Sequence, residues 1–223
     1  MRLFLDSADP AEIHRVRAWG VLDGVTTNPA LVAKRGGDMR ETLRAALDAS
    51  PGEVFCQAIG WDDAAVLKAQ ARWLHGVSER VVVKLPMSRA GIQALGELKR
   101  EVPAMPIAVT MVASVAQALL CGKLGADVVA LFNGPLEQAL DQPVDLVRPV
   151  RAIYANYGYA TKILSCGRMP RSVGDFAAAG SDICTLRYEF FQLMYEHPYT
   201  DKRAAVFAED WTKAFGDRRW PDG

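Results

Sequence analysis

A lysine that closes a run of valines has the clearest chemical potential in this sequence. Residues 80–86 read RVVVKLP. The three valines predict a short strand buried on both faces, because β-branched residues fit the pleat of a covered sheet. The ammonium group of Lys84 must then either reach water or lie where a low dielectric favours the neutral amine. A neutral lysine amine attacks ketones and aldehydes and forms Schiff bases. A strand-end lysine that simply reaches solvent is the alternative interpretation.

Four more polar side chains stand at the ends of short apolar runs. Asp6 follows 3–5, Asn28 follows 24–27, Gln57 follows 54–56 and Thr110 follows 106–109. Each has a plain structural interpretation beside a functional one: Asp6 and Thr110 could cap the loops that follow their strands, and Asn28 before Pro29 is a common turn pair.

Alternating strands and helices must position these residues. The expected strands lie at 3–5, 24–26, 54–56, 81–83, 106–109, 127–132, 162–164 and 182–186. Helical patterns lie between or after them, at 11–19, 38–49, 61–74, 90–100, 114–124, 144–157, 172–179 and 201–215. Such alternation predicts right-handed βαβ units and a parallel sheet. Eight units of roughly 25 residues favour an α/β fold of the closed (β/α)₈, or TIM, barrel type. We expect one barrel domain over residues 1–223.

A barrel would bring the polar strand ends together. Catalytic residues of such barrels lie at the C-terminal ends of the strands, around one mouth. The five polar residues above belong to the first five expected strands, so the fold predicts that they converge on one site.

Composition narrows the possible partners and compartments. The 26 basic residues balance the 26 acidic ones, so neither a nucleic-acid-binding surface nor an acidic tail is indicated. The four cysteines are widely separated and form no C-x-x-C pair, which argues against zinc and against a disulfide framework. No apolar run is long enough to span a membrane. We expect a soluble protein of the reducing cytoplasm, without a cofactor.

Several motifs together resemble the transaldolase family, especially its short members, the fructose-6-phosphate aldolases and small transaldolases. The matching stretches are collinear over nearly the whole chain: 5–8 (LDSA), 24–29 (GVTTNP), 82–86 (VVKLP), 124–127 (LGAD), 210–211 (DW) and 214–216 (AFG). The GVTTNP run is quite specific, and its occurrence together with the lysine strand is more so.

The resemblance implies a class I aldol mechanism that needs no metal. Lys84 would form an iminium with the C2 ketone of a sugar or sugar phosphate, and the C3–C4 bond would break. The counterpart of Asp6 acts as general acid/base in the family, and those of Gln57 and Thr110 help to hold a catalytic water. Asn28 would bind hydroxyls of the remaining three-carbon, dihydroxyacetone-type unit, beside Thr27. That unit is either transferred to an aldehyde, as in transaldolases of pentose phosphate metabolism, or released, as in aldolases.

The family's markers for these two reactions are divided here. Phe132 stands where the aldolases have a tyrosine, as in many transaldolases, and it favours transfer because it has no hydroxyl. Gln57 in place of the transaldolase glutamate and Ala130 in place of a serine are aldolase-like. We lean towards transfer, with a lyase that uses an altered acceptor as the alternative.

The acceptor end departs further from the family. An arginine usually follows the sixth strand and meets the substrate phosphate, whereas this chain reads FNGP at 132–135. Arg168 keeps a cation after the seventh strand, beside Ser165 and Cys166, and Arg187 adds one after the eighth. We hypothesise that the two arginines bind an anionic acceptor. The alternative for Arg187 is a surface ion pair.

Two further expectations concern the whole protein. The C-terminal helix and the aromatic connection before it carry more apolar surface than a monomeric barrel requires. By resemblance this end contacts neighbouring subunits in ring-like pentamers or decamers, and packing on its own barrel is the alternative. A drifted, non-catalytic sugar-phosphate-binding barrel is the rival function. The intact Asp6, Asn28, Lys84 and Thr110 argue against it.

Overall fold

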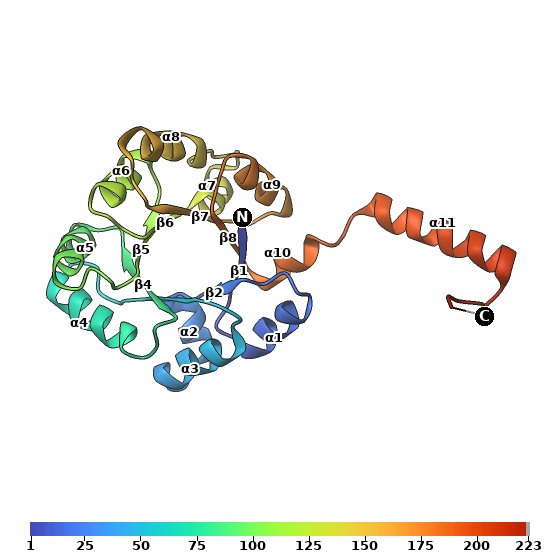
Figure 1. Ribbon diagram of the computed structural model, residues 1–223, viewed down its shortest axis with the longest axis horizontal. Coiled ribbons are helices and arrows are strands. Elements are labelled where there is room, and N and C mark those ends of the chain that lie inside the picture. The colour runs from blue at the N-terminus through green and yellow to red at the C-terminus, as the bar shows by residue number, and fades with distance from the viewer. Residues whose placement is uncertain (222–223) are drawn as a thin grey trace. The chain divides into compact units, whose positions relative to one another are not determined.

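Short apolar runs form a closed barrel of parallel strands in the computed structural model, which describes residues 1–221 (Figure 1). Each strand pairs with its neighbours in sequence order, and the ladder closes between the first and the last strand. The strands are β1 (Arg2–Asp6), β2 (Gly24–Thr26), β3 (Val54–Gln57), β4 (Val81–Pro86), β5 (Ile107–Val112), β6 (Val128–Leu131), β7 (Lys162–Cys166) and β8 (Ile183–Leu186). The chain is therefore a (β/α)₈ barrel, which confirms the fold predicted from the alternating pattern.

Helices cover the outside of the barrel. These helices are α1 (Pro10–Ala18), α2 (Pro29–Arg35), α3 (Met39–Ala49), α4 (Ala64–His75), α5 (Arg89–Glu101), α6 (Val115–Lys123), α7 (Asn133–Leu140), α8 (Val147–Tyr157), α9 (Pro170–Ala178) and α10 (Tyr188–Leu193). A further helix, α11 (Pro198–Phe215), follows them in the sequence. Several begin as the sequence predicts: the Asp9 carboxylate accepts a hydrogen bond from the Ala11 N–H, and Pro10 occupies the first turn of α1.

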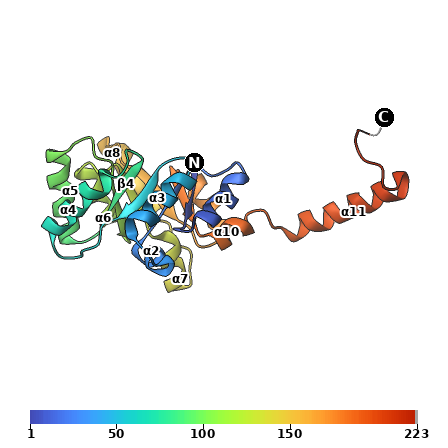
Figure 2. The ribbon, with the colours of Figure 1, turned by 90° about the horizontal axis from the view of Figure 1, so that it is seen from below.

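Three short helices were not expected from the sequence. α7 and α10 each begin two residues after the preceding strand ends, and α2 begins three residues after β2 ends. In α2 the Asn28–Pro29 pair, which also reads as a turn, provides the cap and the first helical residue. Figure 2 shows α2 and α7 on the same side of the barrel, away from the chain's N-terminus. They therefore surround the mouth formed by the C-terminal ends of the strands.

The period-2 alternation of the strands separates two apolar cores. Residues that point outwards pack against the helices, whereas inward-pointing residues fill the barrel: Phe4, Phe55, Val82, Ala108, Val128, Ala130, Leu164, Cys166 and Ile183, with Phe132 packed against them. The rings of Phe4 and Phe55 meet edge to face at 5.5 Å. Gly24 is required beside them, because a Cβ there would lie 2.5 Å from the Phe4 ring. This packed interior fills the barrel below the mouth formed by the C-terminal ends of the strands.

The described residues form two compact units, Met1–Phe191 and a second unit from Gln192 onwards that contains α11. The barrel and its covering helices belong to the first unit. The expectation of a single domain through residue 223 stays a prediction. Within residues 1–221, every helix falls short of the length and apolar character needed to cross a membrane.

Candidate active site

A cavity of about 410 Å³ opens at the C-terminal ends of the strands, above the packed interior. Positions on all eight strands contribute to it, and so do the segments that follow β2, β6 and β7. The polar and charged lining residues are Asp6, Thr26, Asn28, Gln57, Lys84, Thr110, Arg168 and Thr185; Phe55, Met111, Phe132, Leu164 and Cys166 are among the others. The convergence predicted for Asp6, Asn28, Gln57, Lys84 and Thr110 is present.

Lys84 lies inside β4 rather than at its end, because the strand continues to Pro86. It has the same inward orientation as Val82, two residues earlier, and only 7% of it is exposed. Its Nζ donates a hydrogen bond to the main-chain carbonyl of Thr27 at 2.8 Å. The lysine is therefore held across the barrel and does not extend into solvent, contrary to the alternative interpretation.

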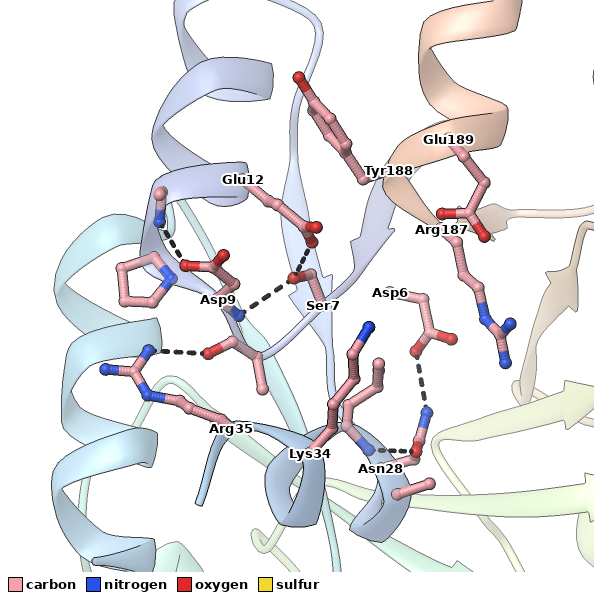
Figure 3. Close-up of a pocket in the computed structure, with 15 residues that line it drawn as sticks. Asp6, Ser7, Asp9, Glu12, Asn28, Lys34, Arg35, Arg187, Tyr188 and Glu189 are labelled. Carbon is pink, nitrogen blue, oxygen red and sulfur yellow. Dashed lines mark hydrogen bonds between the residues drawn. The ribbon is translucent and has the colours of Figure 1, made fainter. Parts of the chain in front are cut away.

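Asp6 faces the same cavity from the end of β1 and is also 7% exposed. Its Oδ1 accepts a hydrogen bond from the Thr26 hydroxyl at 2.9 Å. The Asn28 amide nitrogen lies 3.5 Å from the same oxygen (Figure 3). The Thr26 hydroxyl in turn lies 2.7 Å from the Thr185 hydroxyl. Because Oδ1 has these donors, Oδ2 is the carboxylate oxygen available to a bound substrate.

The side-chain amide of Asn28 caps α2 and also lines the cavity. Its Oδ1 accepts the Leu31 N–H and caps α2, which fixes the orientation of the side chain. The Nδ2 group then points toward Asp6 and the cavity. The cap thus positions a hydrogen-bond donor at the wall of the cavity.

A bulge in β5 brings two adjacent residues to the cavity. The β5–β6 register places Val109 opposite Val129 but Val112 opposite Leu131, so β5 has one extra residue between the two pairs. Met111 lies at the bulge with φ of 65°, a left-handed conformation that is uncommon outside glycine. Thr110 and Met111 consequently both line the cavity, although strand alternation would have turned Met111 away.

The remaining wall combines an aromatic ring, a thiol and a guanidinium. Phe132 caps α7, and Cys166 and Arg168 follow from β7. An Arg168 Nη donates to the Gly167 carbonyl at 2.9 Å, which leaves its other N–H groups for a ligand. Burial raises the pKa of the Cys166 thiol to about 11, and the charges of Lys84 and Arg168 only partly oppose this effect. Cys166 is therefore a neutral thiol at physiological pH, which suits a small polar contact rather than a nucleophile.

Three candidate residues lie outside this cavity. Ser165 points outwards from β7, where its hydroxyl is buried between Asn133 and the Ser181 hydroxyl, 2.9 Å away. Strand alternation explains this, since Cys166 takes the inward position. The Thr27 hydroxyl donates a hydrogen bond to the Phe55 carbonyl. Thr27 therefore contacts Lys84 through its main-chain carbonyl and not through its side chain. Arg187 lines a neighbouring cavity instead.

Sequence reasoning missed Thr26, Thr185 and Met111. Thr26 and Thr185 lie two residues before Asn28 and Arg187, and period-2 alternation along β2 and β8 would have indicated their inward orientation. No comparable signal marks Met111, because a bulge changes the alternation locally.

No cluster of three or more histidine, cysteine, aspartate or glutamate side chains suited to a metal ion occurs within the described part of the chain. The cavity's own chemistry is that of a buried amine, a carboxylate and hydrogen-bonding hydroxyl and amide groups.

The chain is similar over nearly its whole length to one protein family. The sequence model of the transaldolase/fructose-6-phosphate aldolase family matches residues 3–218. A probable transaldolase of Coprothermobacter proteolyticus is 38% identical over 217 residues, which cover 97% of this chain and 99% of that protein. Probable transaldolases of Phenylobacterium zucineum and Aquifex aeolicus are 39% and 36% identical, each over 96% of this chain and 97% of their own length.

Proposed function

The chain belongs to the transaldolase/fructose-6-phosphate aldolase family of enzymes, and from this premise we propose that it transfers a dihydroxyacetone-type unit between a ketose, or ketose phosphate, and an aldehyde through a Schiff base on Lys84. The observation that carries the proposal is the burial of Lys84 within reach of the same cavity as the Asp6 carboxylate. A simple binding site has no need for a buried amine at this place.

Schiff-base formation begins when the neutral Lys84 amine attacks the C2 carbonyl of the ketose. Asp6 transfers protons as the carbinolamine forms and loses water, leaving the iminium. The Thr27 carbonyl that accepts the Lys84 hydrogen bond holds the amine in place before attack. Gln57 and Thr110, on the neighbouring strands β3 and β5, hold the water that enters and leaves.

Carbon–carbon cleavage then uses the iminium as an electron sink. Asp6 removes the proton of the C4 hydroxyl, the C3–C4 electron pair moves into the iminium, and an aldehyde leaves. The enamine of the three-carbon unit stays on Lys84, with its hydroxyls bound by Asn28. Addition of a second aldehyde reverses these steps and completes the transfer.

Phe132 supports transfer over release. Release requires protonation of the enamine carbon and hydrolysis of the iminium, and a phenyl ring supplies no proton for this step. Gln57 and Ala130 favour the alternative, a lyase that releases the three-carbon unit. The two reactions share every step up to the enamine.

Borohydride trapping tests the proposal directly. We expect dihydroxyacetone or fructose 6-phosphate, reduced in the presence of the enzyme, to leave a stable mass increment on the peptide that contains Lys84. The Lys84→Arg variant, which keeps the charge, should take up no adduct. Lys162 is an exposed lysine on β7, so an adduct equally frequent on its peptide would indicate nonspecific reaction and contradict the proposal.

Added aldehyde acceptors then distinguish the two reactions. Transfer predicts that product appears only when an acceptor is present, whereas a lyase releases free dihydroxyacetone without one. If Lys84→Arg binds sugar phosphates and no ketose forms an adduct on the natural enzyme, the non-catalytic binding barrel is the better description.

Assembly and location belong to the same proposal. We infer a homo-oligomer in which α11 covers another subunit, because none of its residues is buried. The cysteines Cys56, Cys121, Cys166 and Cys184 are all free, which supports a reducing, cytoplasmic environment.

A further inference from the structure

One wall of the cavity that contains Lys84 is formed by Phe132, Cys166 and Arg168 and is here called the β6–β7 wall. Phe132 follows β6 directly, whereas Cys166 ends β7 and Arg168 follows it two residues later. The relative position of these side chains therefore depends on contacts that join the two segments. The start of α7, which lies against β7 (Figure 1), provides such contacts.

The Asn133 side chain joins the two segments on the outer side of the barrel. It is fully buried, and its Nδ2 donates a hydrogen bond to the Ser165 hydroxyl at 3.3 Å. Phe132 and Cys166 are the sequence neighbours of this bonded pair, and both line the cavity. The hydrogen bond thus holds the back of the β6–β7 wall, whose front is formed by the phenyl ring and the thiol.

The same amide group also has an unfavourable feature. Within residues 1–221 the buried Oδ1 of Asn133 has no hydrogen-bond partner. A buried polar atom without a partner destabilises a fold, and an apolar side chain of similar volume, such as leucine, would avoid this effect. Stability alone therefore does not explain an asparagine at this position, whereas a positioning role does.

Gly134 lets α7 approach the end of β7 closely. A Cβ at this position would lie 2.6 Å from the Cys166 carbonyl oxygen and 2.8 Å from the Arg168 main-chain nitrogen. Both atoms belong to the backbone, so any side chain at residue 134 forces one of the two segments to move. The φ of Gly134 lies outside the left-handed region, so the glycine is needed for space rather than for its conformation.

We propose that Asn133 and Gly134 are positioning residues for the aldehyde acceptor: they hold the β6–β7 wall in the shape that receives it. In the proposed mechanism Asn28 and Lys84 hold the three-carbon unit near β2 and β4, which leaves the side of β6 and β7 for the incoming aldehyde. The assignment to the acceptor step rests on the proposed function, whereas the positioning of the wall rests on the packing itself.

Steady-state kinetics with fructose 6-phosphate as donor and the uncharged D-glyceraldehyde as acceptor test the role of Gly134. Gly134→Ala should raise KM for glyceraldehyde about tenfold, because displacement of a positioning element weakens the productive geometry. The borohydride adduct that dihydroxyacetone leaves on Lys84 should stay at the level of the natural enzyme. Gly174→Ala adds the same methyl group on α9, where no atom lies within 4 Å, and should change neither value.

Asn133→Leu removes the hydrogen bond and the unpartnered oxygen together. It should raise the same KM about threefold, as expected for a neutral hydrogen bond, without lowering the free energy of unfolding measured in urea. Ser165→Ala removes the same bond from its other end, so the effects of the two substitutions on KM should not add in the double variant. An Asn133→Leu variant that is less stable and keeps the natural KM would show that the amide is only structural.

An acceptor KM that is unchanged in both Gly134→Ala and Asn133→Leu overturns the proposal. A parallel loss of the Lys84 adduct also overturns it, because the substitutions would then disturb the whole barrel rather than one wall. Alkylation separates this question from the proposed function: at pH 10, iodoacetamide should modify Cys166 faster in Gly134→Ala than in Gly174→Ala, since movement of the β7 end exposes the thiol. A faster rate supports the positioning of the wall even when borohydride traps no adduct, and equal rates contradict it even when Lys84 is trapped.

Discussion

At the scale of single residues, the hydroxyl groups of two threonines hold the Asp6 carboxylate in place. Thr26 and Thr185 form a short chain that ends on Asp6, and all three are buried. In the proposed mechanism Asp6 accepts and releases protons, so one of its oxygens must be held in place while the other faces the substrate. Under that proposal Thr26 is a positioning residue for Asp6.

Thr26→Val tests this role with nearly the same side-chain shape. A hydrogen bond to a charged group contributes about 1.5–3 kcal/mol, so kcat should fall roughly tenfold or more if the transition state depends on it. Thr26→Ser keeps the hydroxyl and should restore kcat. A valine variant with an unchanged kcat would show that the contact is only structural.

The Cys166 thiol gives a second prediction at this scale. With a pKa of about 11, this thiol is ionised in about one molecule in a thousand at pH 8, so iodoacetamide should modify it very slowly. The rate should rise nearly tenfold per pH unit up to pH 10, since only the thiolate reacts. Peptide mass spectrometry measures this rate, with Cys121, which is fully buried, as the unreactive reference. Rapid, pH-independent labelling of Cys166 would contradict its description as a neutral thiol.

At the scale of elements, the sequence predicted the strands and most helices because apolar runs and caps are local signals. Lys84 and Asp6 were found because each belongs to a run whose neighbours are strictly apolar. Strand limits were less accurate: β4 continues past Lys84, and β7 continues to Cys166 although the expected strand ended at residue 164. Because Ser165 lies inside β7 next to the inward-pointing Cys166, its side chain points outwards and not into the cavity as expected.

The bulge in β5 is a feature of the site that local sequence patterns do not predict. Sequence alternation assigns one side chain per two residues to the barrel interior, whereas the extra residue in β5 lets Thr110 and Met111 both line the cavity. Met111 adopts its left-handed conformation between two residues that pair with β6, Val109 and Val112, and no local motif predicts this change of register.

A pair of substitutions measures the backbone strain at Met111. Glycine normally destabilises a strand relative to alanine, but at φ of 65° it avoids a steric penalty that alanine retains. We expect Met111→Gly to exceed Met111→Ala in free energy of unfolding by about 1 kcal/mol, measured by urea denaturation. The same comparison at Lys162, an exposed strand position without positive φ, should give the opposite order. Equal stabilities of the two Met111 variants would mean that the bulge relaxes without cost.

At the scale of the whole molecule, α11 is notable for the apolar side chains that its own unit leaves exposed. Its 18 residues include no buried side chain, and Phe207 and Phe215 are 61% and 48% exposed. Within the second unit, Trp211 contacts the rings of Phe215 and Trp220, so some of the aromatic surface is clustered locally. Helices in proteins gain most of their stability by packing an apolar face, which is missing here.

A second subunit would supply that packing and would make assembly part of the stability of the C-terminal region. Replacing Phe207 and Phe215 together by glutamate should reduce the mass measured by light scattering and lower the helical circular dichroism, because the charges prevent burial and the helix loses its cover. Lys202→Gln with Lys213→Gln changes the net charge by the same amount on the same helix, and should leave the assembly intact. If the phenylalanine variant keeps the mass of the natural protein, α11 is not the contact between subunits. A natural protein that is monomeric at all concentrations would refute the oligomer altogether, and the apolar side chains of α11 would then need a different partner.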